Sequence, residues 1–588
     1  MCGIAGLILN ADAAPPAPET LARLARALAH RGPDGTGQTM VGRIALLSTR
    51  LAIIDLEGGD QPLFAGSASL VANGEIYNYR ELRAAMPETH FATGSDCEPP
   101  LHLWLRNGSD YAKPLRGMYA IAVHERVGRT VTLSRDPFGI KPLYLAQIPD
   151  GLAFASEPQA LLDSGLVARI IRSAAREELL QIQFVTGTET IFEGIHRVLP
   201  GETLTCADGH VLDRRRISAL PEGGPEEIDE ETALARLDAA LAESVELHLR
   251  SDVPYGIFLS GGIDSSAVLG MMRRLTNQEV LAFTAGFAAP GAADERETAA
   301  AVARAVGARH ETIEITEAMV WEHLPEIVSC MDDPAADYAI IPSWLLAKRA
   351  RQDVKVVLSG EGGDEMFAGY GRYRTAMRPW WLGGRVMRAR GTFDRLHVLR
   401  TRPSGWRDGL AADEATTTLE AGRTRLATVQ ATDIAGWLPN DLLIKLDRCL
   451  MAHGVEGRTP LLDRGVAEAT FRLPDMLKVR RGQGKWLLRR WLERHLPAAR
   501  PFARKQGFTV PIGAWIAVAG ARLGPLVAAS PAIAEIAEPA RVISLFRNAA
   551  GRREGFAAWS LLFYALWHRR HAEGLLPSGD VFETLAAR

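Results

Sequence analysis

The thiol of Cys2 is the first side chain in this chain whose type and position could do chemistry. A free thiol with a pKa of about 8.5 is only a few per cent thiolate at neutral pH. If Met1 is removed, Cys2 also carries the α-amino group, whose pKa near 8 makes it a general base for the thiol, directly or through one water. A cysteine at position 2 is usually accidental when it stands alone, so its meaning depends on the motifs that follow.

A second reactive stretch is Ser-Gly-Gly-Ile-Asp-Ser-Ser at residues 260–266, after a short apolar strand predicted at 256–259. Glycines that let the backbone approach a ligand, followed by a helix start, make an anion site, and we expect Ser265 or Ser266 to cap that helix. Asp264 would hold Mg²⁺ against bound phosphates. Glycines alone would favour an ordinary strand-turn-helix corner. The full string resembles the pyrophosphate loop of enzymes that split ATP between its α- and β-phosphates, and the chain has no Gly-x-x-x-x-Gly-Lys-Ser/Thr loop.

A third string, Ser-Gly-Glu-Gly-Gly-Asp-Glu at residues 359–365, again follows a predicted strand. Its carboxylates, at Glu361, Asp364 and Glu365, would repel a triphosphate unless Mg²⁺ lay between them. The string therefore predicts metal coordination, with Asp264 and Asp364 as ligands. A solvated acidic turn is the alternative.

The composition indicates a soluble globular protein. The 588 residues predict about two to four domains, and the net charge of −3 gives no basic excess for nucleic acid. Five cysteines without a Cys-x-x-Cys pair favour a reducing, cytosolic compartment over disulfides or a zinc site. The chain starts directly in a strand rather than in a signal segment. The longest uncharged stretch, Gln506 to Ala521, is interrupted by Gly507, Pro511 and Gly513, so we predict no transmembrane helix.

The N-terminal part reads as many short strands with few helices. A helix is predicted at 20–29, and strands at 44–47, 51–54, 70–72 and 116–123, with Arg50 between the first two. Such a pattern favours stacked sheets flanked by helices.

Four strings in this part carry a resemblance: Met-Cys-Gly-Ile-Ala-Gly at the start, Arg-Gly-Pro-Asp at 31–34, Asn-Gly-Glu-Ile-Tyr-Asn at 73–78 and Arg-Asp-Pro-Phe-Gly-Ile-Lys-Pro-Leu-Tyr at 135–144. They resemble the glutaminase domain of class II glutamine amidotransferases, whose nucleophile is an N-terminal cysteine. Together with the loop at 260–266 they resemble glutamine-hydrolysing asparagine synthetases of the bacterial type. The resemblance covers nearly the whole chain. It implies an αββα Ntn-hydrolase sandwich joined to a doubly wound α/β ATP-pyrophosphatase domain.

The resemblance also implies roles in the glutaminase site. Cys2 would attack the glutamine amide, and Asn73 with the Gly74 N–H would form the oxyanion hole. Arg50 would clamp the α-carboxylate, although a lone arginine there would otherwise be read as a surface ion pair. Glu75 and Asp96 would hold the α-ammonium.

Four further residues of this domain bear on the geometry of the site. Arg31 and Asp34 are assigned to ordering the loop over the site. Pro99 and Pro100 depart from the family pattern and should delay the helix after Asp96.

The polar stretch Leu220 to Glu227 is the predicted linker between a glutaminase domain at 1–220 and a synthetase domain at 228–588. After it, a helix is predicted at 231–250, and strands then alternate with helices as far as residue 358. This order predicts a parallel sheet covered on both faces, with ligands beyond the strand carboxyl ends. Ser260, Ala285 and Ser359 lie at those ends.

In the synthetase domain the resemblance implies that the nucleotide is held by Leu259, Ser260, Gly261, Gly262, Asp264, Ser265, Ser266, Ala285, Ser359 and Gly360. Glu361 would support formation of the acyl-adenylate. Lys505, which would otherwise be read as solvent-exposed, would neutralise charge on the α-phosphate. The string at 454–463, Gly-Val-Glu-Gly-Arg-Thr-Pro-Leu-Leu-Asp, is assigned to the acceptor side of the cleft. Gly482 to Lys485 is read as a turn, and residues 374–432 match no motif.

These expectations combine into one function, the ATP- and Mg²⁺-dependent amidation of aspartate to asparagine through β-aspartyl-AMP. Ammonia from glutamine would pass through an internal channel. Two alternatives stay open: a related amidotransferase acting on a peptide, sugar acid or antibiotic precursor, and a non-catalytic relative that only binds ligands. We expect a cytoplasmic protein with small-molecule partners, namely glutamine, aspartate and ATP. Neither nucleic acid nor membrane is expected, and a homodimer is the assembly to test.

Overall fold

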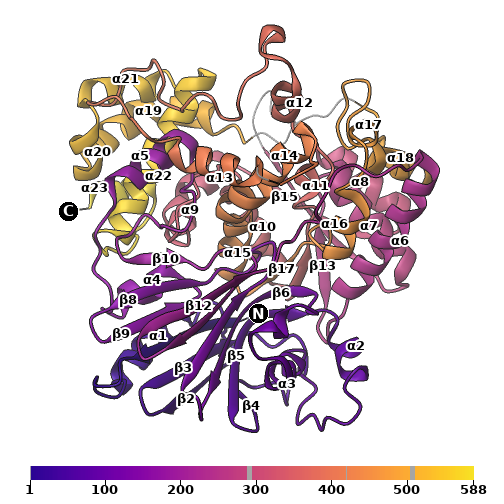
Figure 1. Cartoon of the computed structure of the whole chain (residues 1–588). Helices are drawn as coiled ribbons and strands as arrows, with labels where there is room; N and C mark the ends of the chain where they lie inside the picture. The colour runs from indigo at the N-terminus through magenta and orange to yellow at the C-terminus, as the bar shows by residue number, and fades with distance from the viewer. Residues whose placement is uncertain (1, 288–294, 419, 504–509, 588) are drawn as a thin grey trace.

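The computed structural model describes residues 2–287, 295–418, 420–503 and 510–587. Two layers of the molecule are visible in Figure 1, a strand-rich N-terminal half and a helix-rich C-terminal half. The boundary between the two halves lies between β12, which ends at Arg216, and α6, which begins at Glu230.

The N-terminal half is a sandwich of two antiparallel six-stranded sheets, counted over the described residues, with strand orders β10-β8-β9-β1-β3-β2 and β12-β11-β7-β6-β5-β4. Apolar side chains from both sheets, including Ile4, Leu46, Val71 and Leu133, fill the space between them. Helices α1 and α4 pack outside the first sheet and α3 outside the second. The predicted αββα sandwich is therefore confirmed. The elements are β1 (Cys2–Leu9), α1 (Pro18–Leu28), β2 (Gly35–Val41), β3 (Ile44–Arg50), β4 (Leu63–Ala65), β5 (Ala68–Ile76), α2 (Tyr79–Ala84), α3 (Glu98–Asn107), β6 (Gly117–Glu125), β7 (Thr130–Arg135), β8 (Tyr144–Ile148), β9 (Gly151–Ala155), α4 (Pro158–Asp163), α5 (Ser173–Ile182), β10 (Ile195–Arg197), β11 (Glu202–Ala207) and β12 (His210–Arg216).

Three sequence predictions in this half are corrected. Residues 51–54 form no strand, since β3 ends at Arg50. Asn73 and Gly74 lie inside β5 rather than after it. The two prolines do not delay α3, which starts at Glu98 and holds them in its first turn, where proline costs no helical hydrogen bond.

The C-terminal half is built on a parallel sheet of order β15-β14-β13-β16-β17. Neighbouring residues of its strands point to opposite faces: Val357 packs with α10 and α15, and Val356 and Leu358 pack with α7. The sheet is thus covered on both sides, as the strand-helix alternation predicted. Its elements up to β17 are α6 (Glu230–His248), β13 (Tyr255–Phe258), α7 (Ile263–Leu275), β14 (Leu281–Phe287), α8 (Arg296–Val306), β15 (Arg309–Ile315), α9 (Glu317–Ser329), α10 (Ile340–Ala350), β16 (Val356–Leu358), α11 (Gly363–Met366), α12 (Gly371–Met377), α13 (Asp408–Thr418), α14 (Arg425–Thr432), the π-helix η3 (Asp433–Leu442), α15 (Leu443–Met451) and β17 (Glu456–Arg458).

The helix after the 260–266 loop begins earlier than predicted. Its N-cap is Gly262, and Ser265 and Ser266 lie within the first turn, so neither caps it. Instead, the hydroxyl of Ser265 accepts a hydrogen bond from the backbone N–H of Ser260, at 3.3 Å, which ties the loop to the helix.

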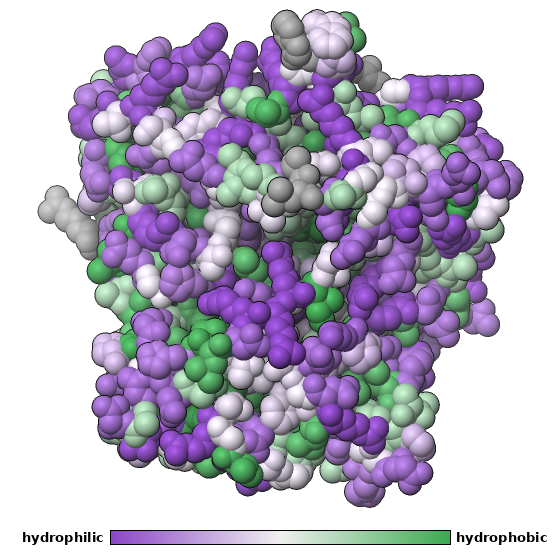
Figure 2. All heavy atoms as spheres, in the orientation of Figure 1, coloured by the Kyte–Doolittle hydropathy of each residue, from purple (hydrophilic) through white to green (hydrophobic). Residues whose placement is uncertain are grey.

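Helices complete the chain, and they include α16 (Arg464–Thr470), α17 (Asp475–Lys478), α18 (Trp486–His495), α19 (Ile512–Ala529), α20 (Pro531–Ile536), α21 (Pro539–Arg547), α22 (Arg552–His571) and α23 (Val581–Ala586). α19 is continuous through Gly513, so this glycine does not interrupt the helix as the sequence predicted. By length and apolarity alone α19 could cross a membrane. This single helix is weak evidence for a membrane span, because 44% of its apolar window is buried and the helix packs against α21 and α22. The face in Figure 2 is mostly hydrophilic, with apolar residues scattered over it.

Candidate functional site

The first site lies where β1 meets β5, the strand that carries Asn73. Cys2 starts β1, pairs in register with Arg50 of β3 and is buried. Its backbone nitrogen lies 3.2 Å from Oδ1 of Asn73, a residue of the facing sheet. Burial is the main cause that raises the pKa of the Cys2 thiol, so a nearby base is required to activate it.

Asn73 and Gly74 fit an oxyanion hole. The amide nitrogen Nδ2 of Asn73 is buried and, among the residues that the structure describes, has no hydrogen-bond partner. A buried donor left without a partner is costly unless a ligand completes it. Gly74 must be glycine, because a Cβ there would lie 2.1 Å from the carbonyl oxygen of Met118.

Acidic side chains gather behind this site. Asp96 is buried and accepts a 2.7 Å hydrogen bond from the Ile76 N–H, and burial raises its pKa to about 6. Burial, with Glu456 and Asp96 nearby, raises the pKa of Glu75 well above its ordinary value. An ammonium group placed between Glu75 and Asp96 would relieve this repulsion.

Arg50 is held over the site by the loop that follows it. Its guanidinium donates to the Asp60 carboxylate at 2.9 Å and to the carbonyl oxygens of Leu56 and Asp55, at 3.1 and 2.5 Å. A glutamine α-carboxylate bound there would have to replace part of these contacts.

The second site is a cavity of about 590 Å³ at the carboxyl ends of β13, β14 and β16. Nine of the ten residues expected to bind ATP line it; the exception is Ser266, which is fully buried within α7 and does not reach the cavity. Glu361 and Asp364 line it as well. The topology thus collects the loops after three strands into one site, the usual place for ligands of such sheets.

A lysine joins the two proposed metal ligands. Nζ of Lys485 lies 2.7 Å from Oδ1 of Asp364 and also contacts the Asp264 carboxylate. Burial alone would lower the pKa of Lys485, but the two carboxylates raise it above its usual value. The turn assigned to Gly482–Lys485 therefore has a charged role that sequence reasoning missed; the signal was a lysine after a Gly-x-Gly string.

The donor set suits Mg²⁺ only together with phosphates. Among the described residues no group of three or more His, Cys, Asp or Glu side chains could hold a metal. Asp264 and Asp364 supply two carboxylates beside the phosphate loop, and Mg²⁺ is commonly held by one or two carboxylates plus substrate phosphates. The residues present fit the ion in that form.

Lys445 is a second cavity residue with no role predicted from the sequence. Its Nζ lies 2.9 Å from Oδ2 of Asp337 and 4.0 Å from Oε1 of Glu361. Burial raises the pKa of Glu361, and Lys445 opposes that rise. Lys445 therefore neutralises part of the negative charge at the cavity wall.

Several expected residues lie elsewhere. Glu365 does not appear in the described lining of the cavity, and Oε1 of its carboxyl group accepts a 2.8 Å hydrogen bond from the Tyr370 hydroxyl. Within the described part of the cavity lining, neither Glu456 nor Arg458 appears: they lie on β17, where Arg458 pairs with Glu456 at 2.5 Å and faces Glu75 at 3.5 Å. Arg458 of the string at 454–463 thus faces the glutaminase half, and the assignment of the string to the acceptor side stays a prediction. Lys505 lies outside the described residues.

Arg31 and Asp34 make contacts that the sequence did not predict, since both reach the other half of the molecule. Arg31 is fully buried and binds Asp447 of α15, and Asp34 binds Lys355 at 2.9 Å. They connect the two halves, and the Asp34 carboxylate also accepts a 2.9 Å hydrogen bond from the Ala52 N–H, in the segment that follows Arg50. Their predicted role in ordering the loop over the site stays a prediction.

An Ntn-type sandwich that starts at a buried cysteine, joined to a parallel-sheet domain with a phosphate loop, defines a glutamine amidotransferase fused to an ATP-dependent synthetase domain. Comparisons with known proteins support this class. Residues 1–216 match the family model "Glutamine amidotransferase domain", and residues 236–569 match "Asparagine synthase".

Curated relatives match over most of their length. The chain is 33% identical to a putative glutamine-hydrolysing asparagine synthetase of Mycobacterium bovis, covering 97% of both chains. It is 32% identical to asparagine synthetase 1 of Bacillus subtilis, covering 88% of both. It is 29% identical to asparagine synthetase B of Escherichia coli, covering 88% of this chain and 83% of that one. The chain belongs to the glutamine-hydrolysing asparagine synthetase family, whose members are ATP-using ligases.

Proposed function

We propose that this enzyme amidates aspartate to asparagine through β-aspartyl-AMP, with ammonia released from glutamine at Cys2. The observation that carries the proposal is the pairing of a buried cysteine against Asn73 in one half with a phosphate-loop cavity holding Glu361 in the other. One site fits release of ammonia, and the other fits activation of a carboxylate by ATP.

In the glutaminase step Cys2 would attack the side-chain amide, and Asn73 Nδ2 with the Gly74 N–H would stabilise the oxyanion. The partnerless Nδ2 atom supports this role. Removing one such donor typically costs about 2.7–4 kcal/mol in catalysis. Arg50 would bind the α-carboxylate of glutamine, and Glu75 and Asp96 would bind its α-ammonium.

In the synthetase step the loop at 260–266, with Ala285, Ser359 and Gly360, would hold the nucleotide. Asp264 and Asp364 would hold Mg²⁺, which neutralises phosphate charge when bound. Lys485 and Lys445 would add positive charge at the cavity wall, together with Lys505. Glu361 would stabilise the forming acyl-adenylate. Ammonia would have to travel inside the protein, because ammonium is not a nucleophile.

The test uses purified enzyme with ATP, Mg²⁺, glutamine and aspartate. Asparagine and AMP should appear in equal amounts. Glutamate release without asparagine would reject aspartate as the acceptor and direct the search to a peptide, sugar acid or natural-product precursor. Replacing aspartate with such carboxylates in a pyrophosphate-release assay would then identify the acceptor.

A further inference from the structure

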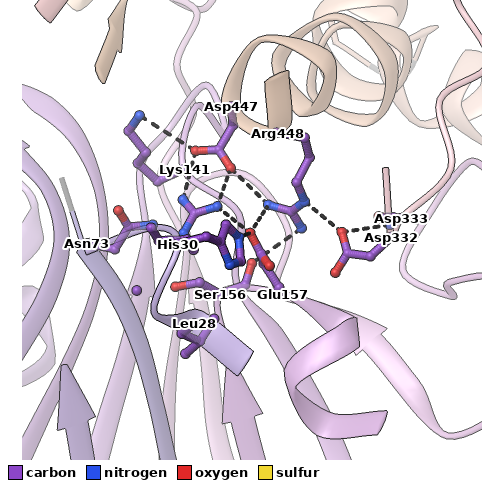
Figure 3. Close-up of polar contacts among 12 residues, drawn as sticks. Leu28, His30, Asn73, Lys141, Ser156, Glu157, Asp332, Asp333, Asp447 and Arg448 are labelled. Carbon is purple, nitrogen blue, oxygen red and sulfur yellow. Dashed lines mark hydrogen bonds and ion pairs between the residues drawn. The ribbon is translucent and has the colours of Figure 1, made fainter. Parts of the chain in front are cut away.

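Helix α15 carries charged side chains that serve two different parts of the molecule. Lys445 lines the ATP cavity and contacts Asp337 and Glu361. Asp447 and Arg448, within one turn of it, extend into the N-terminal half (Figure 3). One short rigid element thus touches the synthetase cavity and the glutaminase half.

Arg31 connects this helix to Cys2. Its Nε donates to the carbonyl oxygen of Cys2 at 3.2 Å. Its Nη1 and Nη2 donate to the two oxygens of Asp447 at 2.8 and 2.9 Å, a bidentate fork. Arg31 is fully buried, so these contacts have no competing water. The backbone of the nucleophile is therefore held by a residue that the other half of the molecule fixes.

The charges around this fork balance. Glu157 accepts from Nη1 of Arg31 at 2.7 Å, and Lys141 lies 3.8 Å from Asp447. Arg448 joins Asp447, at 2.8 Å, to Asp332, at 2.6 Å. Three cationic and three anionic side chains form one buried network, seen in Figure 3, in which removing any member leaves an uncompensated charge.

We propose that the Arg31–Asp447 pair is the contact through which the synthetase half positions Cys2, and that α15 makes glutamine hydrolysis respond to ligands in the ATP cavity. Arg31 and Asp447 are positioning residues, because neither touches a reacting atom. The inference rests on the proposed role of Cys2 as nucleophile. A small displacement of Cys2 from Asn73 would slow the attack, because misplacement by about 1 Å can cost about 10²-fold in rate.

The primary test is Asp447→Asn, which keeps the shape and removes the charge. Glutamate release is measured against glutamine concentration, with and without ATP, Mg²⁺ and aspartate. The kcat should fall on the order of tenfold to a hundredfold at a nearly unchanged KM, because the glutamine contacts are untouched. In the wild-type enzyme, we expect ATP, Mg²⁺ and aspartate to change the rate of glutamine hydrolysis. In Asp447→Asn this change should be absent. Ammonia-driven synthesis should remain close to wild type.

Arg31→Lys is the second variant, because lysine keeps the charge but cannot form the fork. The matched control is Arg197→Lys. Arg197 makes an equally buried bidentate pair with Asp333, at 2.6 and 2.7 Å, across the same two halves, and neither residue is hydrogen-bonded to Cys2.

The two positioning variants should lose hydrolysis and its response to ligands, while the control keeps both. Equal loss in all three variants, or loss of ammonia-driven synthesis along with hydrolysis, would show a purely structural pair and overturn the inference. Normal hydrolysis in Asp447→Asn would also overturn it. Wild-type enzyme that releases no glutamate would instead reject the proposed function.

Discussion

Nζ of Lys485 lies 2.7 Å from Oδ1 of Asp364 at the wall of the ATP cavity, and the same amine contacts Asp264. Lys485 is buried and comes from the start of α18, far along the chain from both carboxylates. This ion pair therefore joins the phosphate loop, the loop after β16 and the C-terminal helices at one point.

Replacing Lys485→Met should abolish ATP-dependent synthesis with either glutamine or ammonia, because Asp264 and Asp364 would lose the buried ammonium group that pairs with both of them. We expect a rate loss of at least about 10²-fold. Breaking a buried pair should also lower the free energy of unfolding by about 3–5 kcal/mol. Pyrophosphate release and urea denaturation measure the two effects. Glutamine hydrolysis, measured in the same sample, is the control, and unimpaired synthesis would show that the pair is only structural.

Replacing Cys2→Ala should abolish glutamate release and glutamine-driven synthesis. Synthesis from free ammonia should continue, because the ATP cavity contains no group from Cys2 among its described lining. Enzyme that retains Met1 should show the same loss, since an acylated nitrogen is not a base. Glutamate release by the alanine variant at the wild-type rate would contradict the assignment.

Replacing Glu361→Gln should suppress product formation from both nitrogen sources while leaving at least part of the glutaminase activity. The change removes a charge at the cavity wall with almost no change in volume. The ammonium group of Lys445 then lacks the carboxylate that lies 4.0 Å away in the wild type. Parallel assays of glutamate and pyrophosphate separate the two sites. Normal product formation would show that Glu361 has only a structural role.

Glutamine binding should weaken as the pH falls through about 6. Burial raises the pKa of Asp96 to about 6, and only the ionised carboxylate can pair with the α-ammonium of glutamine. The KM for glutamine should therefore rise in wild type below pH 6. In Asp96→Asn the KM should be high throughout and lack this step. If the wild-type KM for glutamine does not change between about pH 5 and about pH 8, Asp96 does not bind the α-ammonium group as proposed.

Glu365 should make the fold less stable as the pH rises. Burial raises its pKa to about 8, so the folded state holds a proton that the unfolded state, with a pKa near 4.3, releases. Between these two values the folded state binds more protons, and the free energy of unfolding should decrease by up to about 1.4 kcal/mol per pH unit. Glu365→Gln should lack this slope and be the more stable protein at pH 8. Urea denaturation at several pH values checks it, and parallel slopes would contradict it.

Short sequence motifs predicted many of the candidate site residues and the class of fold. The Cys2 motif, Asn73–Gly74 and the loop at 260–266 were readable because each is a short run whose backbone and side chains act together. The alternation of strands and helices predicted the parallel sheet, and so the meeting of Ser260, Ala285 and Ser359 at one edge.

Only the tertiary structure showed which residues distant in sequence contact one another. Lys485 looked like part of a turn, and Arg31 like part of a loop over the site, because nothing near them in sequence shows their partners. Arg458 stood in a string assigned to the acceptor, yet β17 turns it toward Glu75. Buried charges must find opposite charges wherever the fold brings them, so such pairings depend on the packing of distant elements rather than on local sequence.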